Sequence, residues 1–305
     1  MLIFVVDSQG SSPGRKGFCM GVSESGEFTG TIGGGIMEVK LIELAKHKLA
    51  NNQVEGIIKL QFHDKTKSKN RSGLICSGRQ IVALVSVDQS DQQLIEKLKV
   101  ARNDIDISIS ENGLAESVEE DFQESITINH EQSFECLIRV KHISNIHIFG
   151  AGHVGVALSN QMNLLGFRVN LFDNRDDLNT IKNLSKGICF KRINYSDVLE
   201  SITITQTDYA VIASYSYSDD KVLIKELWNL PFAYIGMMGS DAKITQLKKE
   251  LAQEGITEED IQHVDTPIGI NIYSKTAEEI AVSIAAKIIL SKNITLPTGR
   301  DYSQI

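Results

Sequence analysis

The chain has 305 residues, of which 42% are hydrophobic and 23% are charged, so its length and composition predict about two globular domains. No apolar run approaches the roughly 18 residues of a membrane-spanning helix, and the formal net charge of -8 disfavours binding to nucleic acid or anionic lipid. The four cysteines form no CxxC pair, which argues against a zinc site or a disulfide framework. Because no basic leader precedes the short apolar start, we expect a cytoplasmic protein.

The start of the chain is predicted to be a small glycine-rich β region. Nine of the 23 glycines lie between residues 10 and 35, where short apolar runs such as residues 2–6 alternate with tight-turn residues. Three consecutive glycines at 33–35 then lead into a predicted amphipathic helix over residues 36–49. Its apolar residues recur at helical spacing and are Ile36, Val39, Ile42 and Leu49. We therefore expect a triglycine loop at the amino end of this helix.

A strand, a helix and a half-buried strand are predicted next, over residues 81–87, 94–100 and 105–109. Between residues 103 and 138 there is no Lys or Arg, whereas ten Asp or Glu residues lie between residues 104 and 135. This acidic segment has two open interpretations: a solvated strand face with a connector, or a surface for a basic partner. We expect the linker within residues 112–144. The chain is therefore divided into a glycine-rich domain with an acidic connector, residues 1–140, and a second domain, residues 141–305.

The second half of the chain alternates strands and helices. Strands are predicted at residues 146–149, 168–172, 210–213 and 233–236. The apolar stripes of the helices are Val154, Leu158, Met162 and Leu165, then Ile244, Leu247 and Leu251, and finally Ile280, Ile284 and Ile288. Thr276 and Glu279 have capping-box spacing at the start of the last helix. The pattern predicts an α/β fold in which a Rossmann-like parallel sheet, with helices on both faces, follows a smaller glycine-rich α+β domain.

The strongest local motif is GAGHVG at residues 150–155, which follows a predicted strand and opens a helix. In such a turn Gly150 makes the bend, Gly152 lets a phosphate approach the backbone, and Gly155 allows the helix to contact the strand. Asp173 ends the next predicted strand and could bind a ribose 2′-hydroxyl, which would favour NAD over NADP. The motif predicts a Rossmann-type domain and leaves open whether a dinucleotide is bound.

Two further positions are candidate binding elements. The amides of Gly33, Gly34 and Gly35 can form an anion-binding nest at a helix N-terminus, although a steric role explains these glycines equally well. Cys76 lies in a polar turn just before Arg79, where a thiol can act as a ligand. A buried structural cysteine is the commoner outcome for this residue type.

Six sequence blocks extend over nearly the whole chain. They are residues 9–13 (QGSSP), 30–38 (GTIGGGIME), 149–155 (FGAGHVG), 234–240 (YIGMMGS), 267–269 (PIG) and 276–284 (TAEEIAVSI). Together, and in this order, they resemble the XdhC/CoxI family of xanthine dehydrogenase accessory proteins. The agreement of all six blocks is far more specific than any one of them.

The resemblance implies an accessory protein that binds molybdenum cofactor (molybdopterin), protects it while its terminal sulfur ligand is installed, and delivers it to a molybdenum hydroxylase of the xanthine dehydrogenase type. This is a chaperone role rather than catalytic turnover. A cysteine desulfurase and a second copy of the chain are further expected partners. The motifs and the resemblance together give these candidate cofactor-binding residues: Gly33, Gly34, Gly35, Glu38, Cys76, Gly150, Gly152, His153, Gly155 and Asp173. No catalytic or metal-binding residue is assigned.

The chain departs from the family pattern at three places. Ile36 stands where the family commonly has a cysteine after the glycines, which removes a thiolate. Residues 214–217 read SYSY where the family often reads Thr-His-Asp-His, and Asp241 and Ala242 replace the basic residues usual after Gly-Ser, which weakens an anion clamp. Two alternative functions therefore stay open: an NAD-dependent oxidoreductase and a non-catalytic nucleotide-binding scaffold.

Overall fold

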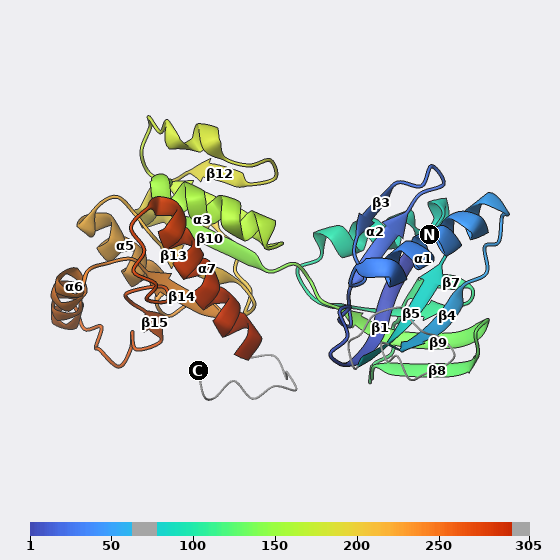
Figure 1. Ribbon diagram of the computed structural model, residues 1–305. Coiled ribbons are helices and arrows are strands. Elements are labelled where there is room, and N and C mark those ends of the chain that lie inside the picture. The colour runs from blue at the N-terminus through green and yellow to red at the C-terminus, as the bar shows by residue number, and fades with distance from the viewer. Residues whose placement is uncertain (63–77, 295–305) are drawn as a thin grey trace. The chain divides into compact units, whose positions relative to one another are not determined.

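The protein consists of two compact units, an N-terminal unit of Met1–His142 and a C-terminal unit of Ile143–Ile305. The structure, a computed structural model, describes residues 1–62 and 78–294, and Figure 1 labels the elements of both units. Each unit has its own hydrophobic core. None of the described helices has the length and hydropathy of a membrane span.

The first sheet of the N-terminal unit is antiparallel, with the strand order β3-β2-β1-β5-β4. Its strands are β1 (Leu2–Gly10), β2 (Cys19–Val22), β3 (Phe28–Gly30), β4 (Ile57–Phe62) and β5 (Gly78–Val85). Successive side chains of β1 point to opposite faces, as the two-residue period of a strand requires. Ile3 and Val5 therefore pack with helix α1 (Gly35–Ala50), whereas Phe4 and Val6 pack with a second sheet.

Helix α1 confirms the predicted helix, but the predicted apolar stripe is partly wrong. Ile36 and Val39 are 57% and 59% exposed. The buried residues of the helix are Met37, Leu41, Ile42, Ala45 and Lys48. Met37, Leu41 and Ala45 follow one another at four-residue spacing, so they also form a helical stripe, and this is the one that packs against the first sheet.

Residues 112–144, within which the linker is expected, are mostly strand, because they supply three strands of a second antiparallel sheet with the order β7-β6-β9-β8, and the two units divide between His142 and Ile143. The strands are β6 (Ile105–Ser110), β7 (Gly113–Glu116), β8 (Ser125–His130) and β9 (Ser133–Val140), and η1 (Gln89–Asp91) and α2 (Gln92–Val100) precede them. Ile107, Ile109 and Phe134 pack with Phe4 and Val6 of the first sheet. The two sheets therefore share one apolar layer.

Acidic side chains of the second sheet are paired with basic residues on its solvated side. Arg139 donates two hydrogen bonds to Asp106, of 2.6 and 2.7 Å. Lys141 lies 2.7 Å from Asp104, in an ion pair of two partly exposed side chains. The acidic segment therefore includes a solvated strand face, as the first of its two interpretations expects.

The C-terminal unit is built on a six-stranded parallel sheet with the order β12-β11-β10-β13-β14-β15. The strands are β10 (Asn145–Phe149), β11 (Arg168–Asp173), β12 (Cys189–Arg192), β13 (Tyr209–Ile212), β14 (Tyr234–Met237) and β15 (Val264–Asp265). The chain builds outward from β10 to β12 and then crosses back to β13. This order is that of the Rossmann fold, so the predicted fold class is confirmed.

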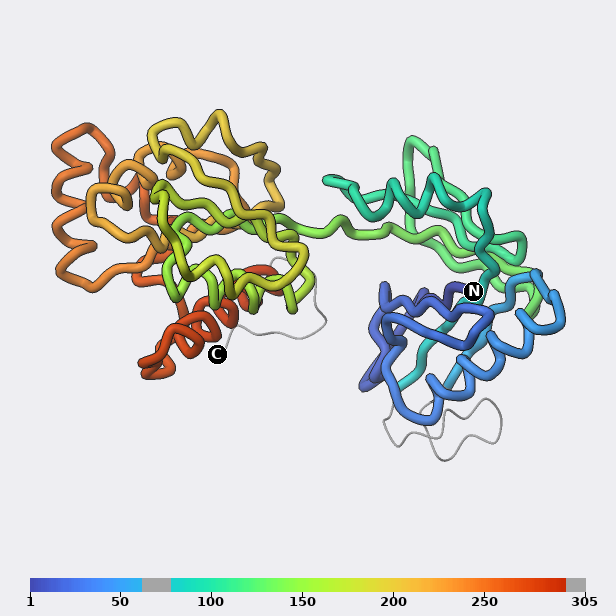
Figure 2. Tube along the Cα trace, turned by 90° about the horizontal axis from the view of Figure 1, so that it is seen from above, coloured from blue at the N-terminus to red at the C-terminus, as the bar shows by residue number. Residues whose placement is uncertain are grey.

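Helices cover both faces of the parallel sheet. They are α3 (His153–Leu164), η2 (Thr180–Asn183), η3 (Tyr195–Asp197), α4 (Val198–Ser201), α5 (Tyr217–Leu227), α6 (Asp241–Gln253) and α7 (Ala277–Ile294). Helices α3 and α7 lie side by side on one face (Figure 1 and Figure 2), where Leu158 and Met162 pack with Ile284. Leu223 of α5 and Leu247 of α6 belong to the core of the opposite face.

The predicted capping box at the start of α7 is confirmed. The backbone N–H of Glu279 donates to Oγ1 of Thr276 at 3.2 Å, and the backbone N–H of Thr276 donates to Oε2 of Glu279 at 3.0 Å. These reciprocal bonds satisfy two amides that the first helical turn leaves without partners.

Candidate functional site

The three glycines of the turn after β10 have three different surroundings. Gly150 has a φ of 120°, and a Cβ there would overlap the carbonyl oxygen of Ala213. A Cβ on Gly155 would overlap the carbonyl oxygen of Gly150. Gly152 is the N-cap of α3, and a Cβ there would meet no atom within 4 Å. The first and third glycines therefore serve packing, and the second faces open space.

That open space is a cavity of about 630 Å³ at the carboxyl ends of the parallel strands. Its lining comes from the start of α3 and from the segments that follow β11, β13, β14 and β15: Gly152, His153, Val154, Gly155, Arg175, Ala213, Ser214, Tyr215, Met238, Gly239, Ser240, Lys243, Pro267, Ile268 and Ile280. The strand order reverses between β10 and β13, and Rossmann folds bind ligands at this point. The cavity is the candidate binding site of the C-terminal unit.

Asp173 lies at the end of β11, but its carboxylate does not line this cavity. The side chain is 1% exposed. It accepts hydrogen bonds from the backbone N–H of Ala151 at 2.6 Å and from Nε and Nη2 of Arg175 at 2.9 and 2.7 Å. Burial alone would raise the pKa of Asp173, but these bonds outweigh it and hold the pKa below its ordinary value. The carboxylate predicted to bind a ribose is therefore bonded to the glycine turn and to Arg175.

Arg175, which is not among the predicted site residues, lines the cavity in place of Asp173. Its guanidinium carbon lies 5.0 Å from the centroid of the Tyr215 ring, in a cation–π contact. The signal that could have identified it is its position two residues after the acidic residue that ends the strand. A basic residue there is typical of sites for phosphorylated ribose.

A second group of polar residues at the cavity surrounds Asp220 of α5. Asp220 is 1% exposed and bonds to Lys243 of α6 and to Oγ of Ser214. Burial is the principal cause that raises the pKa of Asp220 above its ordinary value, although both partners act against it. The structure thus places a cation, Lys243, near the position where Asp241 departs from the family pattern.

The triglycine loop of the N-terminal unit holds an anion of its own, the carboxylate of Glu38. Oε2 of Glu38 accepts hydrogen bonds from Oγ1 of Thr31 at 2.6 Å, from the amide of Ile32 at 2.9 Å and from the amide of Gly34 at 3.1 Å. Burial would raise the pKa of Glu38, but these three bonds lower it below its ordinary value. Part of the predicted anion nest is therefore filled from within the chain.

Replacing Glu38 with glutamine should loosen this loop, because a neutral amide accepts weaker hydrogen bonds than a carboxylate. We expect hydrogen exchange at the amides of Ile32 and Gly34 to become about tenfold faster, which corresponds to a loss of roughly 1.4 kcal/mol. In the unmodified protein the bonds should persist above pH 4.5 and weaken as the pH falls through the lowered pKa of Glu38.

The matched control is Glu43→Gln, on the same helix. Glu43 is 67% exposed and lies 3.5 Å from Lys46. Such a surface pair contributes little, so exchange at Ile32 and Gly34 should stay unchanged. Equal exchange rates in the two variants would show that Glu38 does not hold the loop.

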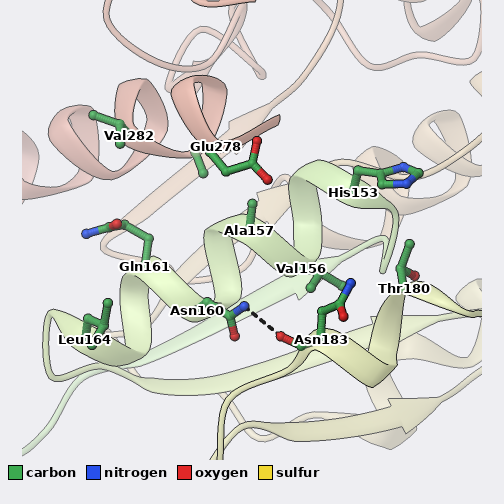
Figure 3. Close-up of a pocket in the computed structure, with 11 residues that line it drawn as sticks. His153, Val156, Ala157, Asn160, Gln161, Leu164, Thr180, Asn183, Glu278 and Val282 are labelled. Carbon is green, nitrogen blue, oxygen red and sulfur yellow. Dashed lines mark hydrogen bonds between the residues drawn. The ribbon is translucent and has the colours of Figure 1, made fainter. Parts of the chain in front are cut away.

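A second, smaller cavity of about 300 Å³ lies between α3 and α7. Figure 3 shows His153 at the amino end of α3, near Thr180, with Glu278 of α7 on the other side. The side-chain amide Nδ2 of Asn160 donates to the backbone carbonyl oxygen of Asn183 at 2.9 Å across the edge of this cavity. His153 lines both cavities.

The thiols do not form a cluster in the described part of the chain. Cys76 lies outside the described residues. Cys136 is buried, Cys19 is partly buried and Cys189 is exposed. Burial raises the pKa of the Cys19 thiol to about 11 and that of the Cys136 thiol to about 12. Within residues 1–62 and 78–294, no group of three or more His, Cys, Asp or Glu side chains could hold a metal ion.

Comparison with known proteins finds relatives along nearly the whole chain. The uncharacterized protein YqeB of Escherichia coli K12 is 28% identical over 290 residues, which are 95% of this chain and 43% of YqeB, so the chain spans less than half of that relative. A Bacillus subtilis 168 protein, described as a probable xanthine dehydrogenase subunit, is 23% identical over 314 aligned residues, covering 96% of this chain and 93% of the relative.

A solved structure from Bacillus halodurans, described as a xanthine dehydrogenase, has the same fold. It superposes with a TM-score of 0.77 over 99% of this chain and 94% of its own, at 21% identity. Two family models also match: the XdhC and CoxI family over residues 1–60, and the XdhC Rossmann domain over residues 146–288. The matches fall in the N-terminal and C-terminal units respectively. The chain therefore belongs to the XdhC and CoxI family.

Proposed function

We propose that this protein is an accessory protein that binds molybdenum cofactor, protects it during sulfuration and delivers it to a molybdenum hydroxylase of the xanthine dehydrogenase type. The observation that carries the proposal is the pair of family matches, one in each unit. The Bacillus subtilis relative, whose description is that of a probable xanthine dehydrogenase subunit, supports it. The partners are then the hydroxylase and a cysteine desulfurase, and a homodimer is a further expectation.

The start of α1 is the surface that we propose for the cofactor. The side chain of Ile36, where relatives commonly have cysteine, is 57% exposed, and Gly35 before it is also exposed. The position is thus open to a large ligand. Because Glu38 fills part of the amide nest, contacts to the cofactor would come from the outer side of this loop.

Retention of the cofactor tests the proposal directly. The purified full chain is incubated with molybdenum cofactor under anaerobic conditions and passed through gel filtration. We expect molybdenum and pterin to elute with the protein. Transfer is then measured as activity gained by a cofactor-free xanthine dehydrogenase. If cofactor passes the column unretained and the hydroxylase gains no activity, the proposal is contradicted.

Ile36→Cys should increase retention, because it restores a soft thiolate ligand at an exposed position. The matched control is Val54→Cys, which adds a thiol at a residue that is 69% exposed in the same unit. We expect several-fold more molybdenum bound to the Ile36 variant than to the control, by elemental analysis of the eluted protein. Equal binding would remove the start of α1 as the cofactor surface.

A further inference from the structure

The cavity of the C-terminal unit presents a guanidinium at the end of β11, and this determines which nucleotide it suits. In Rossmann folds an acidic side chain at this position binds the free ribose 2′-hydroxyl of NAD, whereas a nearby arginine accommodates the 2′-phosphate of NADP. Here Asp173 is 1% exposed and Arg175 lines the cavity. The charge exposed to a ribose is therefore positive.

Arg175 is held in a fixed orientation on two sides. One edge of its guanidinium donates through Nε and Nη2 to Asp173, at 2.9 and 2.7 Å, and one face lies against the Tyr215 ring. Among residues 1–62 and 78–294, its Nη1 group has no hydrogen-bond partner. The side chain is 32% exposed. A preoriented guanidinium with one edge available is suited to an incoming phosphate.

We propose that this cavity binds an adenine nucleotide whose ribose carries a 2′-phosphate, as in NADP. The pyrophosphate would lie at the start of α3, where Gly152 leaves the backbone open. The 2′-phosphate would lie at Arg175, and the exposed ring of Tyr215 lies beside it. This reverses the preference for NAD expected from Asp173. The inference goes beyond the proposed function and does not rest on it, because the start of α1 belongs to the other unit.

Isothermal titration of the full chain with matched nucleotides tests the proposal. Two pairs are compared, NADP with NAD and 2′,5′-ADP with ADP. Each pair measures the contribution of the 2′-phosphate to the binding affinity. We expect the nucleotide with the 2′-phosphate to bind about tenfold more tightly in each pair, as charge-assisted hydrogen bonds to a phosphate predict. Equal affinity, tighter binding of NAD, or no heat with any of the four nucleotides at millimolar concentration would overturn the proposal.

Variants identify the residue responsible. Arg175→Gln should weaken NADP about tenfold and change NAD little, because the 2′-phosphate is the part of the nucleotide that Arg175 contacts. Arg168→Gln removes the same charge from the opposite end of β11 and should leave both affinities unchanged. Unfolding followed by the fluorescence of Trp228, the single tryptophan, shows whether each variant is folded. An equal loss for NADP and NAD in folded Arg175→Gln would overturn the assignment.

The variant Gly152→Val tests whether the nucleotide binds in this cavity. A Cβ at residue 152 would meet no protein atom within 4 Å, so a valine there should fill the space next to the amides of α3 and leave the fold intact. We expect this variant to lose binding of NADP and of NAD while keeping its unfolding midpoint. Unchanged binding of NADP would show that the nucleotide lies outside the turn and would overturn the proposal.

Discussion

Replacing Gly155 with alanine should destabilise the C-terminal unit by about 3 kcal/mol, because overpacking at a close backbone contact forces the turn and helix apart. A Cβ on residue 155 would overlap the carbonyl oxygen of Gly150, which the turn cannot easily move. Gly150 is itself fixed, since its amide donates to the carbonyl oxygen of Phe172 at 2.7 Å. The measurement is urea unfolding followed by fluorescence of Trp228, which packs against the core of this unit.

Gly152→Ala is the control, three residues away in the same motif. Its φ of -71° suits any residue and a Cβ there meets nothing within 4 Å, so only the poorer N-cap preference of alanine should count, and the free energy of unfolding should fall by no more than about 1 kcal/mol. Both glycines belong to the same sequence motif, but only Gly155 lies against another backbone atom. Equal stability of the two variants would contradict the close approach between the turn and α3.

The parallel sheet of the C-terminal unit could be predicted because its signals are local and repeated. β10 is buried along its whole length, so its sequence is apolar apart from two residues whose side chains are also buried, Asn145 and His147. Each helix that follows carries apolar residues three or four positions apart, and Leu158 and Met162 of α3 are fully buried. The strand, turn and helix patterns therefore all predict the same parallel α/β fold.

The second sheet of the N-terminal unit could not be predicted in the same way. β8 alternates apolar and polar residues only at Ile126 and Ile128, and one of its residues is partly buried while five are exposed, so its sequence carries little of the pattern that identifies a half-buried strand. β7 has only four residues. Both strands are at the edges of the sheet. Backbone pairing with β6 and β9 holds them in place, because few of their own side chains are buried. The acidic composition of this segment therefore predicts a solvated strand face with a connector but does not predict the number of strands.

In the candidate site, the sequence predicts where a residue lies along the chain but not where its side chain points. The sequence placed Asp173 at the end of a strand, where the structure has it. The direction of its carboxylate depends on the amide of Ala151, 22 residues earlier, and no local pattern reports that contact. Glu38 likewise belonged to the predicted site, but its bonds to Ile32 and Gly34 follow from the path of the loop. Side-chain direction required the three-dimensional structure.

Replacing Asp208 with asparagine should destabilise the C-terminal unit by about 3 kcal/mol at pH 7, because a buried carboxylate with several donors would become an amide with an unpaired N–H₂ group. Asp208 is fully buried just before β13. It accepts hydrogen bonds from Nδ2 of Asn145 at 2.8 Å and from the amide of Thr205 at 3.0 Å, and Nε2 of His147 lies 3.5 Å away. It therefore ties the start of β13 to the start of β10.

The same carboxylate should make stability depend on pH. Burial alone would raise the pKa of Asp208, but the nearby His147 ring and the hydrogen bonds from Asn145 and Thr205 lower it from 3.8 to about 2. A carboxyl group whose pKa is lower in the folded than in the unfolded protein stabilises the fold. Its full contribution is present above the unfolded pKa and is lost as the pH falls through the folded pKa. The shift corresponds to about 2 kcal/mol, lost between roughly pH 4 and pH 2.

Urea unfolding of both proteins at several pH values, followed by Trp228 fluorescence, measures this effect. The stability difference between the unmodified protein and Asp208→Asn should be largest above pH 4 and should shrink by about 2 kcal/mol at pH 2, because the asparagine cannot titrate. Glu200→Gln, which neutralises an exposed carboxylate of α4, should show no such change. A stability difference that stays constant from pH 7 to pH 2 would mean that Asp208 is not held as a carboxylate by Asn145 and Thr205.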